Sequence, residues 1–152
     1  MPKPKPAFSH LDATGAAKMV DVGHKPVQLR TATAAGELVC QCATIRLLRA
    51  QALPKGDVLA AARLAGILAA KRTDELIPLC HGLPLDSIAV DFTVRADRVL
   101  ISATARTSAK TGVEMEALVA VTIAGLTLYD MMKAVDKTMV LGAVRVTAKT
   151  KV

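Results

Sequence analysis

Aromatic side chains are almost absent from this 152-residue chain. It has no tryptophan, two phenylalanines and one tyrosine, at Phe8, Phe92 and Tyr129. Proteins that bind single-stranded nucleic acid stack bases on several exposed aromatic rings, often on the central strands of a sheet. We therefore expect no nucleic-acid partner. A basic RNA-binding module stays an alternative because the formal net charge is +7.

Long uncharged segments are also lacking. The longest, Ala117–Tyr129, has thirteen residues, fewer than the roughly 20 that cross a bilayer as a helix. The opening Met1-Pro-Lys-Pro-Lys-Pro6 is not followed by the apolar stretch of a secretory signal. We expect no membrane association and a cytoplasmic location.

Cysteine is scarce as well, with only Cys40, Cys42 and Cys80. An odd count without an export signal favours free thiols over structural disulfides. The spacings Cys40-x-Cys42 and Cys80-His81 match the usual zinc-ligand patterns poorly, so we expect no metal site. Part of the positive charge lies at the two ends of the chain. In the rest of the chain, the excess of lysine and arginine over aspartate and glutamate is close to that of an ordinary solvated surface.

The chain does contain enough apolar sequence for one folded domain, with 52% hydrophobic residues. Alternating patterns predict a bent strand within Val27–Cys42, a hairpin of Ser87–Val94 and Val99–Ala105, and a last strand over Val144–Ala148. Helices are predicted over Thr44–Gln51, over Val58–Arg72 after an Asp57 N-cap, and from Thr111 to about Val135. Only Arg63 interrupts the apolar surface of the second helix before its last turn, so we expect that helix to be buried on most sides.

This order of elements predicts an α+β fold of the ferredoxin-like β-α-β-β-α-β type, an antiparallel sheet with helices on one face. Residues 1–8 are expected to form an extended N-terminal arm, and residues 9–152 a single domain. The uncovered sheet face is expected to carry small and apolar residues. Such a face favours association into an oligomer.

Charged residues mark both ends of the last predicted helix. Glu114 and Glu116 lie at its start, and Asp130 and Lys133 lie at its end, about 28 Å away at 1.5 Å per residue. One small ligand cannot reach both ends of one helix, so the two groups can share a site only if it lies between subunits. Alternatively, Glu114 completes a capping box with Thr111, and Asp130–Lys133 is a routine surface pair. The functional interpretation is a lysine that the aspartate orients for proton transfer.

The segment Ile77–Leu85 combines two prolines and a glycine with apolar residues, which predicts an ordered loop. Its Cys80 and His81 are suited to lining a pocket, although a buried structural histidine is an equally good interpretation. Basic residues at predicted element ends suit phosphate groups or simple solvation: Lys25, Arg30, Lys55, Lys71, Arg72, Arg106 and Lys110. Lys55-Gly56-Asp57, directly before a helix, is the most suggestive of them.

Several of these segments together resemble the MoaC family of molybdenum cofactor biosynthesis. The segments are Ser9-His-Leu-Asp12, Met19-Val-Asp-Val22, Lys55-Gly-Asp57, Ala65-Gly-Ile67, Ala69-Ala-Lys-Arg-Thr73, Leu76-Ile-Pro-Leu-Cys-His81, Lys110-Thr-Gly-Val-Glu-Met-Glu-Ala117, Leu128-Tyr-Asp-Met131 and Lys133-Ala-Val135. The resemblance implies a ferredoxin-like subunit in a homo-hexamer of three dimers. It also implies a lyase activity that converts a cyclised dihydro-GTP, made by an upstream radical SAM GTP cyclase, into a cyclic pyranopterin monophosphate with release of pyrophosphate.

The resemblance also implies roles for individual residues. The catalytic group would be Asp130, Lys133 and Lys55. The substrate-binding group would be Leu79, Cys80, His81, Glu114, Met115 and Glu116, with Lys25, Arg30 and Lys149 as basic helpers for the triphosphate. No organic cofactor is implied, although a divalent cation such as magnesium is compatible with a triphosphate.

Two features depart from the family pattern. Gly82 stands where a proline usually follows Cys-His, and the chain ends at Thr150-Lys-Val without a glycine-rich extension. A catalytically weak or dead nucleotide-binding paralogue is therefore a further alternative.

Overall fold

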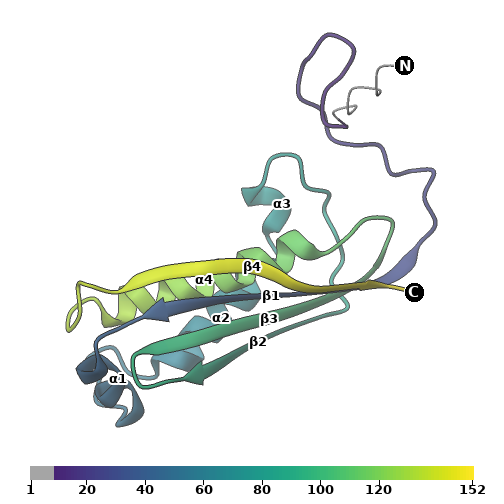
Figure 1. Ribbon diagram of the computed structural model, residues 1–152. Helices are drawn as coiled ribbons and strands as arrows, with labels where there is room; N and C mark the ends of the chain where they lie inside the picture. Colours follow the sequence, from purple (N-terminus) through teal and green to yellow (C-terminus); the bar gives the residue numbers. More distant parts are fainter. Residues whose placement is uncertain (1–8) are drawn as a thin grey trace, which may run out of the picture.

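A single four-stranded antiparallel sheet with helices on one side forms the body of the chain (Figure 1). The computed structural model describes residues 9–152, so the arm predicted over residues 1–8 lies outside the described part. The elements are β1 (Gln28–Val39), α1 (Cys42–Arg49), α2 (Val58–Ala70), α3 (Thr73–Leu76), β2 (Ser87–Val94), β3 (Arg98–Ala109), α4 (Glu114–Met132) and β4 (Val140–Lys151). The strand order β2-β3-β1-β4 confirms the predicted ferredoxin-like α+β fold.

The central strand β1 is irregular, as its sequence predicts. It pairs without interruption with β3, but its register with β4 shifts between Thr33 and Ala34 and again between Ala35 and Glu37. Gly36 lies at the second shift, where a Cβ atom would stand 2.8 Å from Val121 Cγ1 on α4. The close approach of helix and sheet therefore requires glycine at this point.

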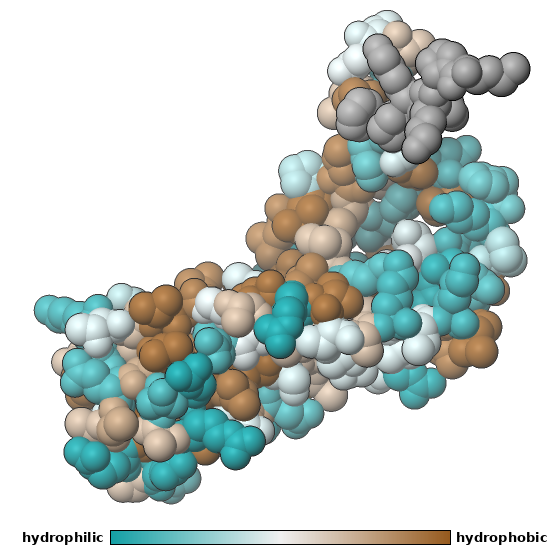
Figure 2. Space-filling view, in the orientation of Figure 1, coloured by the Kyte–Doolittle hydropathy of each residue, from teal (hydrophilic) through white to brown (hydrophobic). Residues whose placement is uncertain are grey.

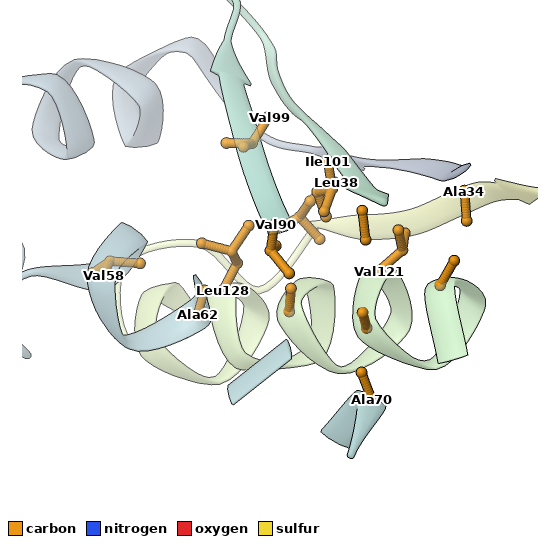
Figure 3. Close-up of a cluster of buried hydrophobic side chains, with 14 of the residues drawn as sticks. Ala34, Leu38, Val58, Ala62, Ala70, Val90, Val99, Ile101, Val121 and Leu128 are labelled. Atoms are coloured by element: carbon orange, nitrogen blue, oxygen red, sulfur yellow. The ribbon is translucent and has the colours of Figure 1, made fainter. Parts of the chain in front are cut away.

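The core lies between the sheet and α4. Leu38 and Ile101 from the sheet and Val121 and Leu128 from α4 are at most 1% exposed, and Figure 3 shows them meeting in one layer. By length and apolar composition α4 is sufficient to cross a membrane, but half of its apolar window is buried inside the domain. It is therefore the core helix of this fold.

Helix α2 differs from its predicted burial. It packs on α4 through a stripe of small or buried residues at Val58, Ala62, Gly66 and Ala70, while Leu64 and Leu68 on its other side are 58% and 48% exposed. The expectation of burial on most sides is wrong for the single chain, because α2 packs against α4 and the edge strand β2 and its side with Leu64 and Leu68 is left exposed. Its predicted Asp57 N-cap is confirmed by a 3.0 Å hydrogen bond from the Ala60 amide.

Two strands extend beyond their predicted bounds: β3 covers Arg98–Ala109 and β4 covers Val140–Lys151. Strand β2 has the predicted bounds, and β1 ends at Val39, before the predicted Cys42. On the uncovered face Thr33 and Thr104 share a 2.9 Å hydrogen bond. Phe92 packs against the core, so within residues 9–152 the central strands present no aromatic platform for RNA.

Candidate functional site

One cavity of about 920 Å³ opens where the start of β1, the end of β4 and the start of α4 meet. Figure 2 shows hydrophilic residues gathered at this end of the molecule, near the C-terminus that is marked C in Figure 1. Nine of the twelve predicted site residues line the cavity: Leu79, Cys80, His81, Glu114, Met115, Glu116, Lys25, Arg30 and Lys149. Its volume suits a nucleotide-sized ligand.

Glu114 does not complete the predicted capping box. Helix α4 has Val113 as its N-cap, with no side-chain cap bond, and Glu114 is its first helical residue. A capping-box glutamate must be the third. The Glu114 carboxylate instead pairs with Lys149 of β4. Partial burial acts to raise its pKa, but the hydrogen bond from Lys149 overcomes this and holds the pKa below its ordinary value.

Glu116 and Cys80 both line the cavity. Glu116 is only 4% exposed, and this burial raises the pKa of its carboxyl, with Glu114 and Asp74 adding to the effect. Burial also raises the pKa of the Cys80 thiol, again with help from Glu116. Cys80 therefore lines the cavity as a thiol and is poorly suited to act as a thiolate nucleophile.

The raised pKa of Glu116 predicts a pH-dependent gain in stability for Glu116→Gln. A carboxyl whose native pKa lies above its unfolded value loses stability as pH rises from the ordinary glutamate pKa through the native one. Glu116→Gln should therefore unfold at higher urea than the wild type at pH 7, and the gain should vanish near pH 4. Glu114→Gln is the matched control of opposite sign, since it loses the Lys149 pair and should be less stable at pH 7. Equal shifts at both pH values would contradict this assignment.

His81 is both a pocket-lining residue and a structural histidine, the two interpretations that the sequence left open. Its Nε2 lies 2.7 Å from the Val20 carbonyl oxygen, and the ring is half-buried at the cavity wall. A carbonyl only accepts, so Nε2 must carry the hydrogen, and in the neutral ring Nδ1 keeps its lone pair. His81 is thus structurally anchored and chemically available as a base.

Lys110 anchors the same N-terminal segment. Its Nζ donates to the Gly23 carbonyl at 2.7 Å, so His81 and Lys110 hold residues 20–23 against the cavity. This segment adds Val20 and Val22 to the lining. Sequence reasoning singled out Lys110 only as one of several basic residues and missed the two valines, whose only signal was the Met19-Val-Asp-Val22 motif.

Arg30 is held by two main-chain carbonyls and by the side chain of Gln28. Its Nε donates to Ala109 O at 3.0 Å, and its Nη2 donates to Lys110 O at 3.2 Å and to Gln28 Oε1 at 3.1 Å. These bonds fix the turn that leads into α4. Contact with a triphosphate remains a prediction for Arg30.

The other three predicted site residues form a separate cluster, which we call the lysine–aspartate trio: Lys55, Asp130 and Lys133. Lys133 Nζ lies 2.7 Å from Asp130 Oδ1, and Lys55 Nζ lies 3.0 Å from Oδ2 and 3.1 Å from the Asp130 carbonyl oxygen. The hydrogen bonds from Lys133 and then Lys55 lower the pKa of Asp130 to about 2, and Asp130 raises the pKa of Lys133. Near neutral pH the aspartate is therefore ionised and the Lys133 amine holds its proton.

The trio and the cavity lie at opposite ends of α4 (Figure 1). The helix between Glu114 and Lys133 spans about 28 Å, so a single chain does not bring the two groups together.

The thiols are free, as predicted: Cys40 is buried, Cys42 exposed and Cys80 intermediate. Burial raises the pKa of Cys40 to about 11. Within residues 9–152 no three histidine, cysteine, aspartate or glutamate side chains are grouped to hold a metal ion.

Gly82 does not require a glycine conformation, since its φ lies outside the left-handed region. A Cβ there would stand 2.9 Å from Asp74 Oδ2, the mobile end of an exposed side chain. We expect Gly82→Ala to stabilise the protein by about 0.4–1 kcal/mol through the unfolded chain, as measured by urea unfolding. Gly56→Ala is the matched control and should destabilise, because Gly56 has φ +81°. A loss of stability for Gly82→Ala would show that Asp74 cannot move aside.

The fold and cavity together define a class of protein, a ferredoxin-like subunit with a nucleotide-sized pocket that has lysines at its rim and a buried carboxyl in its wall. Residues 19–151 match the pattern of the MoaC family. The chain belongs to the MoaC family.

Curated relatives cover most of the chain. It is 58% identical over 144 residues to the cyclic pyranopterin monophosphate synthase of Chloroflexus aggregans, covering 93% of this chain and 87% of the relative. It is 52% identical over 147 residues to the protein of the same name from Streptomyces coelicolor, covering 97% and 86%. It is 57% identical over 134 residues to cyclic pyranopterin monophosphate synthase 1 of Mycobacterium bovis, covering 88% and 79%.

Proposed function

We propose that this chain is a cyclic pyranopterin monophosphate synthase, a lyase of molybdenum cofactor biosynthesis. Its substrate would be (8S)-3′,8-cyclo-7,8-dihydroguanosine 5′-triphosphate, supplied by an upstream radical SAM GTP cyclase, and its products cyclic pyranopterin monophosphate and pyrophosphate. The observation that carries the proposal is the gathering of nine expected substrate residues around one nucleotide-sized cavity, in a chain 52–58% identical to relatives of that name.

The charges around the cavity favour one orientation of the substrate. Lys25, Lys110, Lys149 and Lys151 lie among its lining residues and suit the triphosphate. The buried carboxyl of Glu116 and the imidazole of His81 suit the hydrogen-bonding edge of the purine-derived ring. The ring would therefore lie toward Glu116 and the phosphates toward the lysines.

The reaction needs proton transfers and the departure of pyrophosphate. The Lys133 amine, held protonated by Asp130, is placed to donate a proton, and the Nδ1 lone pair of His81 is available to accept one. Each such group typically contributes about 100- to 10,000-fold to the rate. A substrate hydroxyl oxygen attacks the α-phosphorus and passes its proton to a base such as His81 Nδ1. The bond from the α-phosphorus to the oxygen bridging it to the β-phosphate breaks, and nearby lysines stabilise the charge on the leaving pyrophosphate.

No organic cofactor is needed, because no net oxidation or reduction occurs. A divalent cation such as magnesium would be carried by the triphosphate itself rather than by protein carboxylates. A location in the cytosol agrees with the free thiols and with the burial of the apolar α4.

The complete site would lie between subunits of a homo-hexamer built from three dimers. Within one chain the trio lies at the far end of α4 from the cavity, so a neighbouring copy must supply it. Symmetric association gives each site a cavity from one copy and a trio from the next.

The deciding experiment is turnover by the purified protein. Incubation with the cyclised dihydro-GTP should release pyrophosphate and yield, after oxidation, a fluorescent pterin in equal amount. Binding of the substrate without pyrophosphate release would favour the inactive paralogue instead. Tight salt-dependent binding to generic RNA, with no turnover, would favour the RNA-binding alternative.

A further inference from the structure

Asp136 is a buried carboxylate close to the trio, in the turn between α4 and β4. It is 2% exposed and lies three residues after Lys133. Its Oδ2 accepts hydrogen bonds from the Gln41 amide at 2.8 Å and from Thr44 Oγ1 at 3.0 Å. Its Oδ1 accepts from the Thr138 amide at 2.9 Å and from Thr138 Oγ1 at 2.8 Å. Four donors on one buried carboxylate make a rigid junction.

Two of these donors belong to the start of α1. The N-cap of that helix is Gln41, whose side chain forms no cap bond. Asp136, 95 residues later in the chain, instead accepts from the Gln41 amide, one of the first four backbone donors that a helix leaves unpaired, and a negative charge at a helix N-terminus is favourable. The turn after α4 is thereby fastened to the beginning of α1.

The two fastened segments are those that supply the trio. Helix α1 ends at Arg49 and the chain then runs through a tight connection to Lys55, with the Ala52 amide bonded to Leu47 O at 3.0 Å and the Gly56 amide bonded to Leu53 O at 3.3 Å. Asp130 lies in the last turn of α4, and Lys133 is the C-cap of that helix. Lys55 Nζ closes the arrangement by bonding the Asp130 carboxylate.

We propose that Asp136 is a positioning residue, which sets the distance between Lys55 and the end of α4 by holding α1 against the turn that follows Lys133. Its importance for catalysis rests on the proposed function, because that function makes the trio catalytic. Misplacement of reacting groups by about 1 Å costs on the order of 100-fold in rate.

Three variants test this role. Asp136→Ala removes the junction. Thr44→Val removes only the hydrogen bond from α1 to Asp136 Oδ2, and Thr44→Ser, its matched control, keeps the hydroxyl that makes this bond. We expect kcat to fall by about 100-fold for Asp136→Ala, less for Thr44→Val, and by less than about twofold for Thr44→Ser. KM should stay within about twofold throughout, because neither Asp136 nor Thr44 lines the cavity. Circular dichroism must show each variant folded at the assay temperature.

A second readout does not depend on activity. NMR titration of the aspartate carboxyl carbons measures the pKa of Asp130, which the hydrogen bonds from Lys133 and Lys55 lower to about 2 in the wild type. Asp136→Ala should raise this pKa toward the ordinary aspartate value because Lys55 moves away, and Thr44→Ser should leave it unchanged. The proposal is overturned if the titration of Asp130 is unaltered in Asp136→Ala, or if the two Thr44 variants lose equal activity. A wild type without turnover refutes the proposed function, while the titration still decides the role of Asp136.

Discussion

Lys133→Ala is expected to abolish measurable turnover, with kcat lower by about 100- to 10,000-fold. The Lys133 side chain is 54% exposed and its one ion pair is with Asp130, so its removal leaves no cavity in the core. The unfolding midpoint and the assembly size should equal those of the wild type. What is lost is a protonated amine placed by Asp130 for transfer to the substrate.

Two further variants test whether Lys133 acts by donating its proton or only through its positive charge. Lys133→Arg keeps the positive charge beside Asp130, but a guanidinium does not give up its proton at accessible pH, so its kcat should stay low. Lys137→Ala removes an exposed lysine four residues farther along the chain, in the turn before β4, and should leave kcat unchanged. Turnover would be followed by pyrophosphate release. Activity retained by Lys133→Ala would remove this lysine from the mechanism.

The fold could be predicted from local patterns because each pattern has a local cause. Ser87–Val94 alternates strictly, and Asp57 supplies an N-cap just before an apolar run, so the elements and their order follow from neighbouring residues. The exposure of Leu64 and Leu68 could not be predicted in this way. It depends on which side of α2 finds a partner, and that is decided by the small-residue stripe that meets α4.

In the candidate site, too, features with a local cause could be predicted and features set by distant contacts could not. Sequence motifs pointed to the residues that line the cavity, but not to their partners. Glu114 has Thr111 three residues before it, so a capping box is the natural local prediction, and its actual partner Lys149 is brought near only by the pairing of β4 with β1. The hydrogen bond from the start of α1 to Asp136 is equally non-local. Pairings across the fold leave no periodic signal in one sequence.

Mixing two inactive variants is expected to restore activity if each site is shared between copies. Lys133→Ala damages the trio and keeps the cavity, whereas His81→Ala damages the cavity and keeps the trio. Co-refolded in equal amounts, a cavity from the first variant meets a trio from the second in about one site of four, if copies associate at random in a symmetric assembly. We expect about a quarter of the wild-type kcat per chain.

The matched control mixes Lys133→Ala with Lys55→Ala. Both changes damage the trio, so no combination of copies contains an intact one and no activity should return. Recovery in the first mixture and none in the second would show that cavity and trio come from different chains. No recovery in the first mixture, although both variants co-assemble, would mean that one chain supplies the whole site. That outcome would require α4 to bend or break, since its two ends are about 28 Å apart as a straight helix.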